Sequence, residues 1–160
     1  MATEDLTRVL EEAGAAYELL PHAHTESALD EAAALGLSPD DVAKTLVLKT
    51  PGGYLRAVVP ASCRLDERKV RDITGGGKKH VHLASEDDLR RDYPDFELGA
   101  VPPVGGARRD EVIVDRRVAA RGAVVIEAGS HEQSVRIAAD DLVRAAGAEV
   151  ADICRQDEER

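Results

Sequence analysis

The sequence predicts an α/β protein with one domain, in which helices flank a mixed β-sheet. Three observations lead to this class. The chain has 160 residues, which fits one domain. Hydrophobic residues make up 43% of it, with no Trp and one Phe, so the chain can build an aliphatic core. Helix-like and strand-like segments alternate irregularly and include a hairpin, which favours a mixed sheet over a doubly wound parallel one.

Helices are indicated where apolar residues recur at intervals of three or four behind a capping residue. Gly14 ends the first such pattern, and Ser27, Asp66 and Ser85 are side chains that commonly cap the start of a helix. The expected helices cover, in order, residues 6–13, 28–35, 66–73, 85–89 and 140–146, with a short helical turn starting at 38–39.

Strands are indicated by short aliphatic and β-branched runs between turn-forming residues. The clearest case is a hairpin, because residues 42–48 and 54–59 are such runs and Pro-Gly-Gly at 51–53 turns the chain between them. Further strands are expected at residues 17–20, 81–83, 111–114, 123–127 and 135–137. Residues 99–106, with the sequence Gly-Ala-Val-Pro-Pro-Val-Gly-Gly, are typical of a structured loop.

Charge and cysteine content argue against several classes. The formal net charge of -10 disfavours a protein that coats DNA or RNA through a general basic field, but it allows a pocket that grips one end of an RNA. Cys63 and Cys154 are too far apart in sequence to suggest a cysteine zinc site. Without an apolar leader or membrane-length segment, we expect a cytoplasmic protein with no membrane partner. We expect the domain to cover residues 1–154, followed by an acidic tail at 155–160.

Two histidine pairs have a spacing that could suit metal ligands. His22 and His24, like His80 and His82, are two residues apart and would share a face on a strand. No carboxylate lies within either pair. Nothing resembles the nucleophile elbow of a Ser-His-Asp hydrolase either. We therefore expect no metal and no cofactor.

Lys44 interrupts an apolar strand. On a strand it shares a face with Val42, Leu46 and Leu48, and the other face of the run is also largely apolar. Desolvating an ammonium group is costly, so this side chain either reaches the rim of the sheet or waits for an anion such as a phosphate or a carboxylate. The alternative is an ordinary surface lysine on an edge strand.

Two loop segments could contact an oxygen-rich ligand. Gly99 lets a ligand approach the backbone, and Pro102 and Pro103 stiffen the loop and remove two donors, which suits a ribose or an ester carbonyl. The second segment, Ala-Gly-Ser-His at 128–131, follows an apolar strand, and His131 could exchange a proton near neutral pH. The alternatives are a plain connector and a tight turn.

Together these segments resemble the YbaK/EbsC family, which is related to the editing domain of bacterial prolyl-tRNA synthetases. The resemblance runs from about residue 25 to residue 153 and rests on the matching stretches at 42–46, 99–105, 127–130, 141–144 and 150–153. It implies a curved, barrel-like mixed sheet flanked by helices. It also implies an aminoacyl-tRNA deacylase, a carboxylic ester hydrolase that acts in trans on misacylated tRNA. The expected substrate is tRNA for proline that carries a wrong small amino acid.

The resemblance also assigns the site. It gives catalytic roles to Lys44, Gly99 and Gly129. It gives substrate contacts to their neighbours, Thr45, Ala100, Val101, Pro102, Pro103, Ser130 and His131. Ala100 stands where many relatives have a second glycine, and Pro102 where a small polar residue is common, so the substrate preference stays open.

The implied mechanism positions a water molecule against an ester that is already activated, with Lys44 at the terminal phosphate or the ester and amides near Gly99 and Gly129 facing the carbonyl oxygen. The implied partners are the 3′ end of a misacylated tRNA and, as an option, an aminoacyl-tRNA synthetase. Two alternatives stay open, a non-catalytic tRNA- or synthetase-binding module and a small-ligand hydrolase unrelated to tRNA. Basic side chains such as Lys78, Arg108 and Arg116 around one pocket would disfavour the second alternative.

Overall fold

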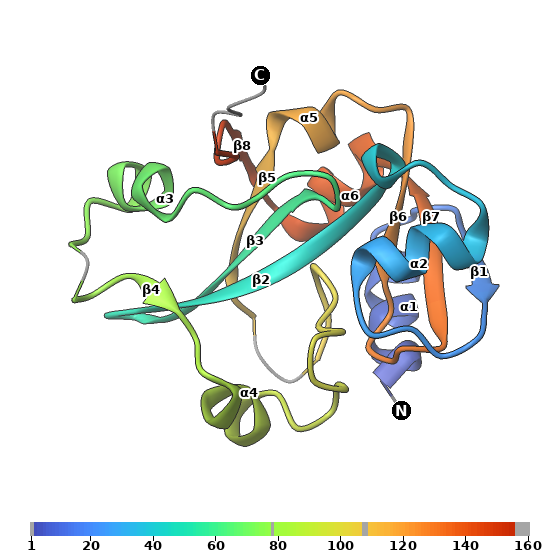
Figure 1. Ribbon diagram of the computed structural model, residues 1–160, viewed down its shortest axis with the longest axis horizontal. Coiled ribbons are helices and arrows are strands. Elements are labelled where there is room, and N and C mark those ends of the chain that lie inside the picture. The colour runs from blue at the N-terminus through green and yellow to red at the C-terminus, as the bar shows by residue number, and fades with distance from the viewer. Residues whose placement is uncertain (1, 78, 107–108, 156–160) are drawn as a thin grey trace.

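A mixed β-sheet organises residues 2–77, 79–106 and 109–155, which the computed structural model describes (Figure 1). In this part of the chain the strands lie in the order β1-β7-β6-β2-β3-β5-β8, and β4 pairs with β2. The strands are β1 (Tyr17–Pro21), β2 (Val42–Thr50), β3 (Gly53–Pro60), β4 (His82–Leu83), β5 (Glu111–Asp115), β6 (Ala123–Glu127), β7 (Gln133–Ala138) and β8 (Glu149–Ala151). The mixed sheet confirms the predicted fold class.

The β2–β3 hairpin forms as predicted and carries Lys44 near the start of β2, at the end of the hairpin away from its turn. The two strands pair in antiparallel register, with Lys44 opposite Val59. On its other side β2 runs parallel to β6, but the register joins only Val42 to Val125 and Ala43 to Ile126. The two strands therefore pair at one end only, just before Lys44.

The helices begin at the capping residues that the sequence indicates. The hydroxyl of Ser27 accepts a hydrogen bond from the amide of Asp30 at 3.1 Å, and Ser85 forms a reciprocal capping box with Asp88. Two short elements escaped prediction, the helix α5 and the strand β8. The helical segments are α1 (Ala2–Glu12), α2 (Ala28–Leu35), the 3₁₀ turn η1 (Pro39–Asp41), α3 (Glu67–Thr74), α4 (Glu86–Asp92), α5 (Arg116–Ala119) and α6 (Ala139–Ala146).

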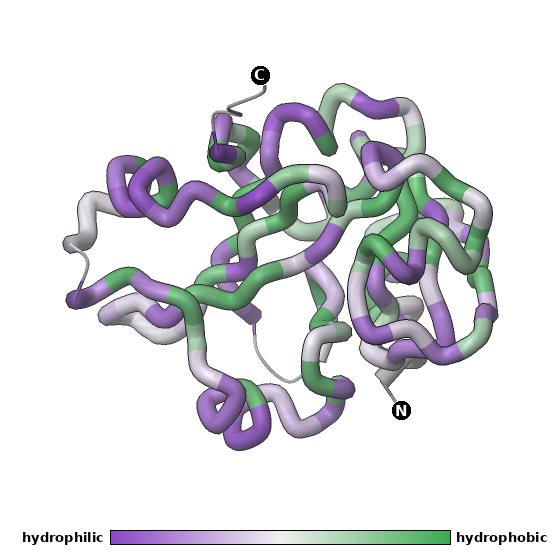
Figure 2. The backbone as a smooth tube through the Cα atoms, viewed as in Figure 1, coloured by the Kyte–Doolittle hydropathy of each residue, from purple (hydrophilic) through white to green (hydrophobic). Residues whose placement is uncertain are grey.

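The two faces of the sheet bury different helices. Ala43 of β2 belongs to a cluster with Leu6 of α1 and Leu142 of α6, whereas its neighbour Val42 packs with Ala32 of α2. Successive side chains of a strand point to opposite faces, so α2 covers one face and α1 and α6 the other (Figure 1). Hydrophobic residues follow the central strands, while α3 and α4 are largely hydrophilic (Figure 2).

Residues 156–160 of the expected acidic tail lie outside the described residues. Within the described part of the chain, none of the helices has both the length and the apolar character needed to span a membrane.

Candidate functional site

Lys44 is half-buried on β2, and among the described residues its ammonium group has no hydrogen-bond or ion-pair partner. Burial lowers the pKa of Lys44, because part of its hydration is lost. The thiols of Cys63 and Cys154 and the carboxyl of Glu127 are near enough to raise this pKa, and Arg64 is near enough to lower it. The structure thus has a partly desolvated cation without a paired anion, as expected if the anion comes from a ligand.

Glu127 links β2 and β6 just beyond the point where their backbone pairing stops. It ends β6, its side chain is buried, and its Oε1 accepts a hydrogen bond from the amide of Thr45, with 3.5 Å between the two atoms. Burial holds the pKa of Glu127 well above its usual range, the nearby carboxyl of Glu31 raises it further, and Lys44 acts in the opposite direction. The hydroxyl Oγ1 of Thr45 is also buried and, in the described part of the chain, has no partner.

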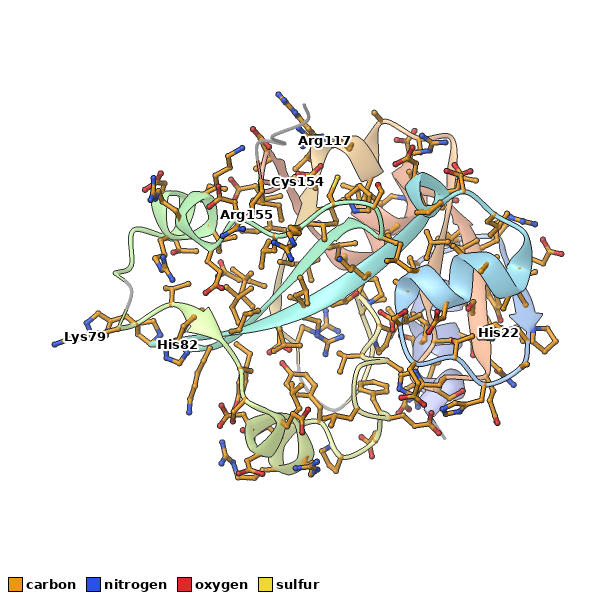
Figure 3. All side chains as sticks on the ribbon, in the orientation of Figure 1. His22, Lys79, His82, Arg117, Cys154 and Arg155 are labelled. Atoms are coloured by element: carbon orange, nitrogen blue, oxygen red, sulfur yellow. The ribbon has the colours of Figure 1, made fainter. Side chains whose placement is uncertain are left out.

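A chain of polar side chains continues from this carboxyl pair to the surface. Glu31 on α2 is buried and accepts a hydrogen bond from the hydroxyl of Ser134 on β7. Nε2 of His22 lies 2.8 Å from the same hydroxyl oxygen. Burial raises the pKa of Glu31, while the Ser134 hydrogen bond lowers it. Figure 3 labels His22, which lies at the edge of the molecule beside β1.

The predicted loop and the predicted strand end are joined by backbone hydrogen bonds. The amide of Glu97 donates to the carbonyl of Gly129 at 2.8 Å, and the amide of Gly129 donates to the carbonyl of Ala100 at 3.0 Å. Gly99 has φ +83°, and a methyl group added there would lie 3.5 Å from the ring of His131. The amide of Gly129 is therefore engaged within the protein, whereas that of Gly99 has no acceptor among the described residues.

The rest of the loop is held by a buried arginine. The guanidinium of Arg56 on β3 donates to the carbonyls of Pro102 and Gly105, both at 2.9 Å, and pairs with Asp110 at 3.1 Å. Arg56 also lies over the ring of Tyr93, 5.4 Å from its centroid. This arrangement fixes the loop against β3, so the stiffness expected from its prolines also depends on Arg56.

The sequence-predicted residues fall into two groups. Lys44 and Thr45 lie beside Glu127, two residues before Gly129, and Gly129 contacts the loop that carries Gly99 and Ala100, with His131 beside it. The other predicted residues lie in different surroundings. Val101 packs in an apolar cluster with Val47, Pro102 binds Arg56 through its carbonyl, Pro103 lines a separate cavity of about 260 Å³, and the hydroxyl of Ser130 accepts from the amide of Glu132.

Sequence reasoning missed four polar residues of this region. Arg56 and Glu127 carry the same signal as Lys44, a charged residue within an apolar strand, and could have been found by it. Glu31 and Ser134 carry no such signal, because their contact joins α2 to β7 across the fold.

Of the two histidine pairs, His22 and His24 lie near this site, because His22 contacts Ser134 and the ring of His24 lies 5.4 Å from that of His131. Among the described residues, no group of three or more His, Cys, Asp or Glu side chains is arranged to hold a metal ion. Lys78 and Arg108 lie outside the described residues. Lys79 lies at the tip of the molecule beyond β4, whereas Arg117 lies on α5 (Figure 3), so these two basic residues do not belong to one rim.

These observations define an α/β domain in which a partly desolvated lysine lies near a strand end whose following turn is hydrogen-bonded to a glycine-rich loop. The chain belongs to the aminoacyl-tRNA editing domain family, whose family model matches residues 22–145. That range includes every site residue named above from His22 to Ser134.

Individual relatives are similar over different lengths. The chain is 31% identical over 96 residues to a proline–tRNA ligase of Bacillus cytotoxicus and 30% identical over 95 residues to that of Fervidobacterium nodosum. Each match covers 59% of this chain but 16% of the ligase. The fold is also similar to the crystal structure of a candidate trans-editing enzyme for prolyl-tRNA synthetase, with a TM-score of 0.86, 25% identity, and coverage of 97% of this chain and 98% of the other.

Proposed function

We propose that this domain hydrolyses the ester bond of misacylated aminoacyl-tRNA, acting in trans. One observation carries the proposal: Lys44 keeps a partly desolvated ammonium that has no anion among the described residues, next to the end of β6 that contacts the Gly99 loop. A terminal RNA phosphate or an ester oxygen supplies the missing anionic or polar partner. Membership of the editing-domain family supports the same chemistry.

The mechanism requires little beyond positioning and charge stabilisation. An aminoacyl ester is already activated, so a water molecule held against its carbonyl carbon suffices as nucleophile. Lys44 anchors the terminal phosphate or orients the ester. The amide of Gly99 faces the carbonyl oxygen, where it stabilises the negative charge of the tetrahedral intermediate. Gly129 acts by holding the Gly99 loop in place, because its own amide is engaged by Ala100.

The substrate we propose is tRNA for proline that carries a wrong small amino acid. The similarity to two proline–tRNA ligases and to a candidate trans-editing enzyme for prolyl-tRNA synthetase supports this choice. An aminoacyl-tRNA synthetase would then be a partner of this domain. The protein would act in the cytoplasm, where tRNA is charged. His131 lines the same turn, and we propose that it contacts the aminoacyl group.

A deacylation panel tests this function. Alanine, serine, cysteine and proline are each attached to tRNA for proline and to two unrelated tRNAs, and release of the amino acid is followed with and without the protein. We expect hydrolysis of at least one wrong amino acid from tRNA for proline at a rate well above the spontaneous one. Binding of charged tRNA without hydrolysis would instead identify a non-catalytic module. Hydrolysis of small esters alone would identify a hydrolase unrelated to tRNA.

A further inference from the structure

Two chain segments run side by side next to Lys44. Leu65 and Cys154 form an antiparallel bridge, and the amide of Arg155 donates to the carbonyl of Arg64 at 2.8 Å. The side chains of Arg64 and Arg155 are both exposed, and neither has an ion-pair partner within the described ranges. Arg64 is near enough to Lys44 to affect its pKa. Two exposed arginines thus lie on neighbouring segments, one of which, Arg64, is near Lys44.

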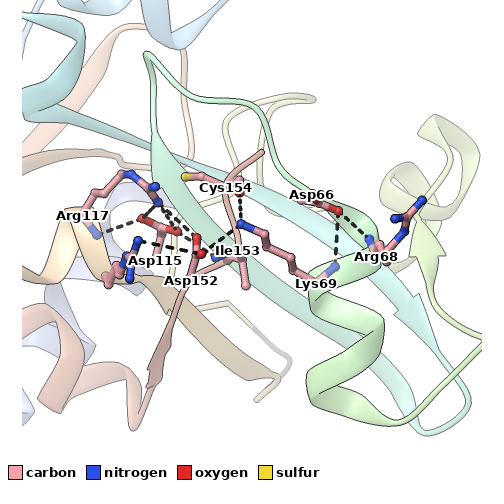
Figure 4. Close-up of polar contacts among 9 residues, drawn as sticks. Asp66, Arg68, Lys69, Asp115, Arg117, Asp152, Ile153 and Cys154 are labelled. Carbon is pink, nitrogen blue, oxygen red and sulfur yellow. Dashed lines mark hydrogen bonds and ion pairs between the residues drawn. The ribbon is translucent and has the colours of Figure 1, made fainter. Parts of the chain in front are cut away.

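Three further cations, from α3 and α5, gather around Asp152 on the segment that leads to Cys154. Lys69 of α3 and Arg117 of α5 pair with Asp152 at 2.9 and 3.2 Å, and Arg116 reaches it at 3.9 Å (Figure 4). Arg117 also pairs with the buried Asp115 at 3.3 Å. Three cations therefore share two carboxylates, and one positive charge is left over. In Figure 3 the labelled residues Arg117, Cys154 and Arg155 lie in one region of the molecule.

We define the basic strip as Arg64, Lys69, Arg116, Arg117 and Arg155. Its five cations are opposed by Asp115, Asp152 and Asp66, and the carboxylate of Asp66 also caps the first amides of α3 at 2.9 and 3.3 Å. Among the described residues the strip therefore has more cations than carboxylates, in a chain whose net charge is -10. A local positive region on an acidic protein orients a polyanion, because the rest of the surface repels it.

We propose that the basic strip binds phosphates of the tRNA substrate and leads its 3′ end to Lys44. This inference rests on the proposed function and adds the surface that receives the RNA. The cations are spread over the loop before α3, α3 itself, α5 and the segment after β8, which is more surface than one small anion can contact. Arginine forks match phosphate oxygens, and their spacing along a surface suits a chain of phosphates.

The test compares two double variants that remove the same number of charges. Arg64→Gln with Arg155→Gln alters the strip. Lys79→Gln with Arg109→Gln alters two exposed cations that also have no ion pair among the described residues and lie outside the strip. Binding of uncharged tRNA is measured by fluorescence anisotropy at several salt concentrations, and KM and kcat are measured with misacylated tRNA.

We expect the strip variant to bind tRNA more weakly and to raise KM roughly tenfold, with kcat nearly unchanged. The slope of log Kd against log salt concentration should become shallower by about one unit for each phosphate contact that is lost. The control variant should resemble the wild type. Equal Kd, KM and salt dependence in the strip variant and the wild type would overturn the inference, as would an equal loss in both double variants. Failure of the proposed function is distinguishable, because uncharged tRNA would still bind through the strip while no aminoacyl-tRNA is hydrolysed.

Discussion

Glu127 accepts a hydrogen bond from the main-chain amide of Thr45, with 3.5 Å between the nitrogen and Oε1, at the point where β2 and β6 stop pairing. A continuing ladder would give that amide a backbone carbonyl as acceptor. Here a buried carboxyl takes its place, next to the only lysine of the proposed site. The separation of the two strands thus creates a polar position in an otherwise apolar sheet.

Replacing Glu127 with Gln should make the protein less sensitive to rising pH. Because the pKa of Glu127 is raised in the folded state, the folded protein holds a proton that the unfolded chain releases near pH 4.3. The stabilisation is complete below that pH and is lost as pH rises through the folded-state pKa. We expect the unfolding free energy of the variant to fall less between about pH 5 and pH 8, measured by urea denaturation. The exposed Glu132→Gln variant should follow the wild type, and identical curves for all three proteins would contradict the account.

Replacing Ser134 with Ala should destabilise the fold. The change removes the hydroxyl that links the buried Glu31 carboxyl to His22, and it leaves that carboxyl without its hydrogen-bond donor. We expect a loss of about 1–3 kcal/mol in the free energy of unfolding. Ser130→Ala is the matched control, because its hydroxyl accepts a single hydrogen bond in a surface turn, and it should cost less than about 1 kcal/mol. Equal losses of unfolding free energy for the two variants would refute the structural role of the Glu31–Ser134–His22 contacts.

Removing Arg56 should release the loop that carries Gly99. Asp110, whose side chain is 5% exposed, would lose its ion pair with Arg56, and the carbonyls of Pro102 and Gly105 would lose the Arg56 donor. We expect Arg56→Ala to cost about 3–5 kcal/mol, and amide exchange in the loop to accelerate. Arg136→Ala, which breaks an exposed pair with Glu18, should cost less than about 1 kcal/mol. Unchanged amide hydrogen exchange in the loop of a folded Arg56→Ala protein would contradict the role of Arg56 in holding the loop.

Gly99 should resist even a single added methyl group. Its φ of +83° is strained for any L-residue with a side chain, at a cost of about 1–2 kcal/mol, although the nearest ring atom of His131 leaves room at 3.5 Å. We expect Gly99→Ala to reduce deacylation because the loop backbone shifts away from the proposed carbonyl position. Gly52→Ala has open space and no such backbone constraint, so its deacylation rate should match that of the wild type. Full activity of Gly99→Ala would remove the loop amide from the mechanism.

The parts of the fold that depend on local sequence could be predicted. The hairpin follows from two β-rich runs around Pro-Gly-Gly, and Ser27, Asp66 and Ser85 cap the helices that they were expected to cap. Short elements such as β8 have too few residues to show a period. For the site, Lys44 could be identified because one charge stands out in an apolar strand.

The remaining polar contacts could not be predicted because their partners are distant in sequence. The hydroxyl of Ser134 lies 103 positions from Glu31, and the amide of Thr45 lies 82 positions from Glu127. No local pattern encodes such a contact; it appears only when the strand order is known. The same holds for the bridge between Leu65 and Cys154 that brings Arg64 beside Arg155.

Replacing Lys44 with Met most directly tests the central claim, that a lysine is kept half-buried to serve a ligand. The measurement is the single-turnover rate of deacylation of misacylated tRNA, with the free energy of unfolding measured in parallel. Lys49→Met on the same strand is the control, because Lys49 already pairs with Asp88 at 3.3 Å. We expect Lys44→Met to lose deacylation at least about a hundredfold and to become up to about 1 kcal/mol more stable, since a desolvated charge is removed. A folded Lys44→Met protein that deacylates tRNA as fast as the wild type would contradict the account.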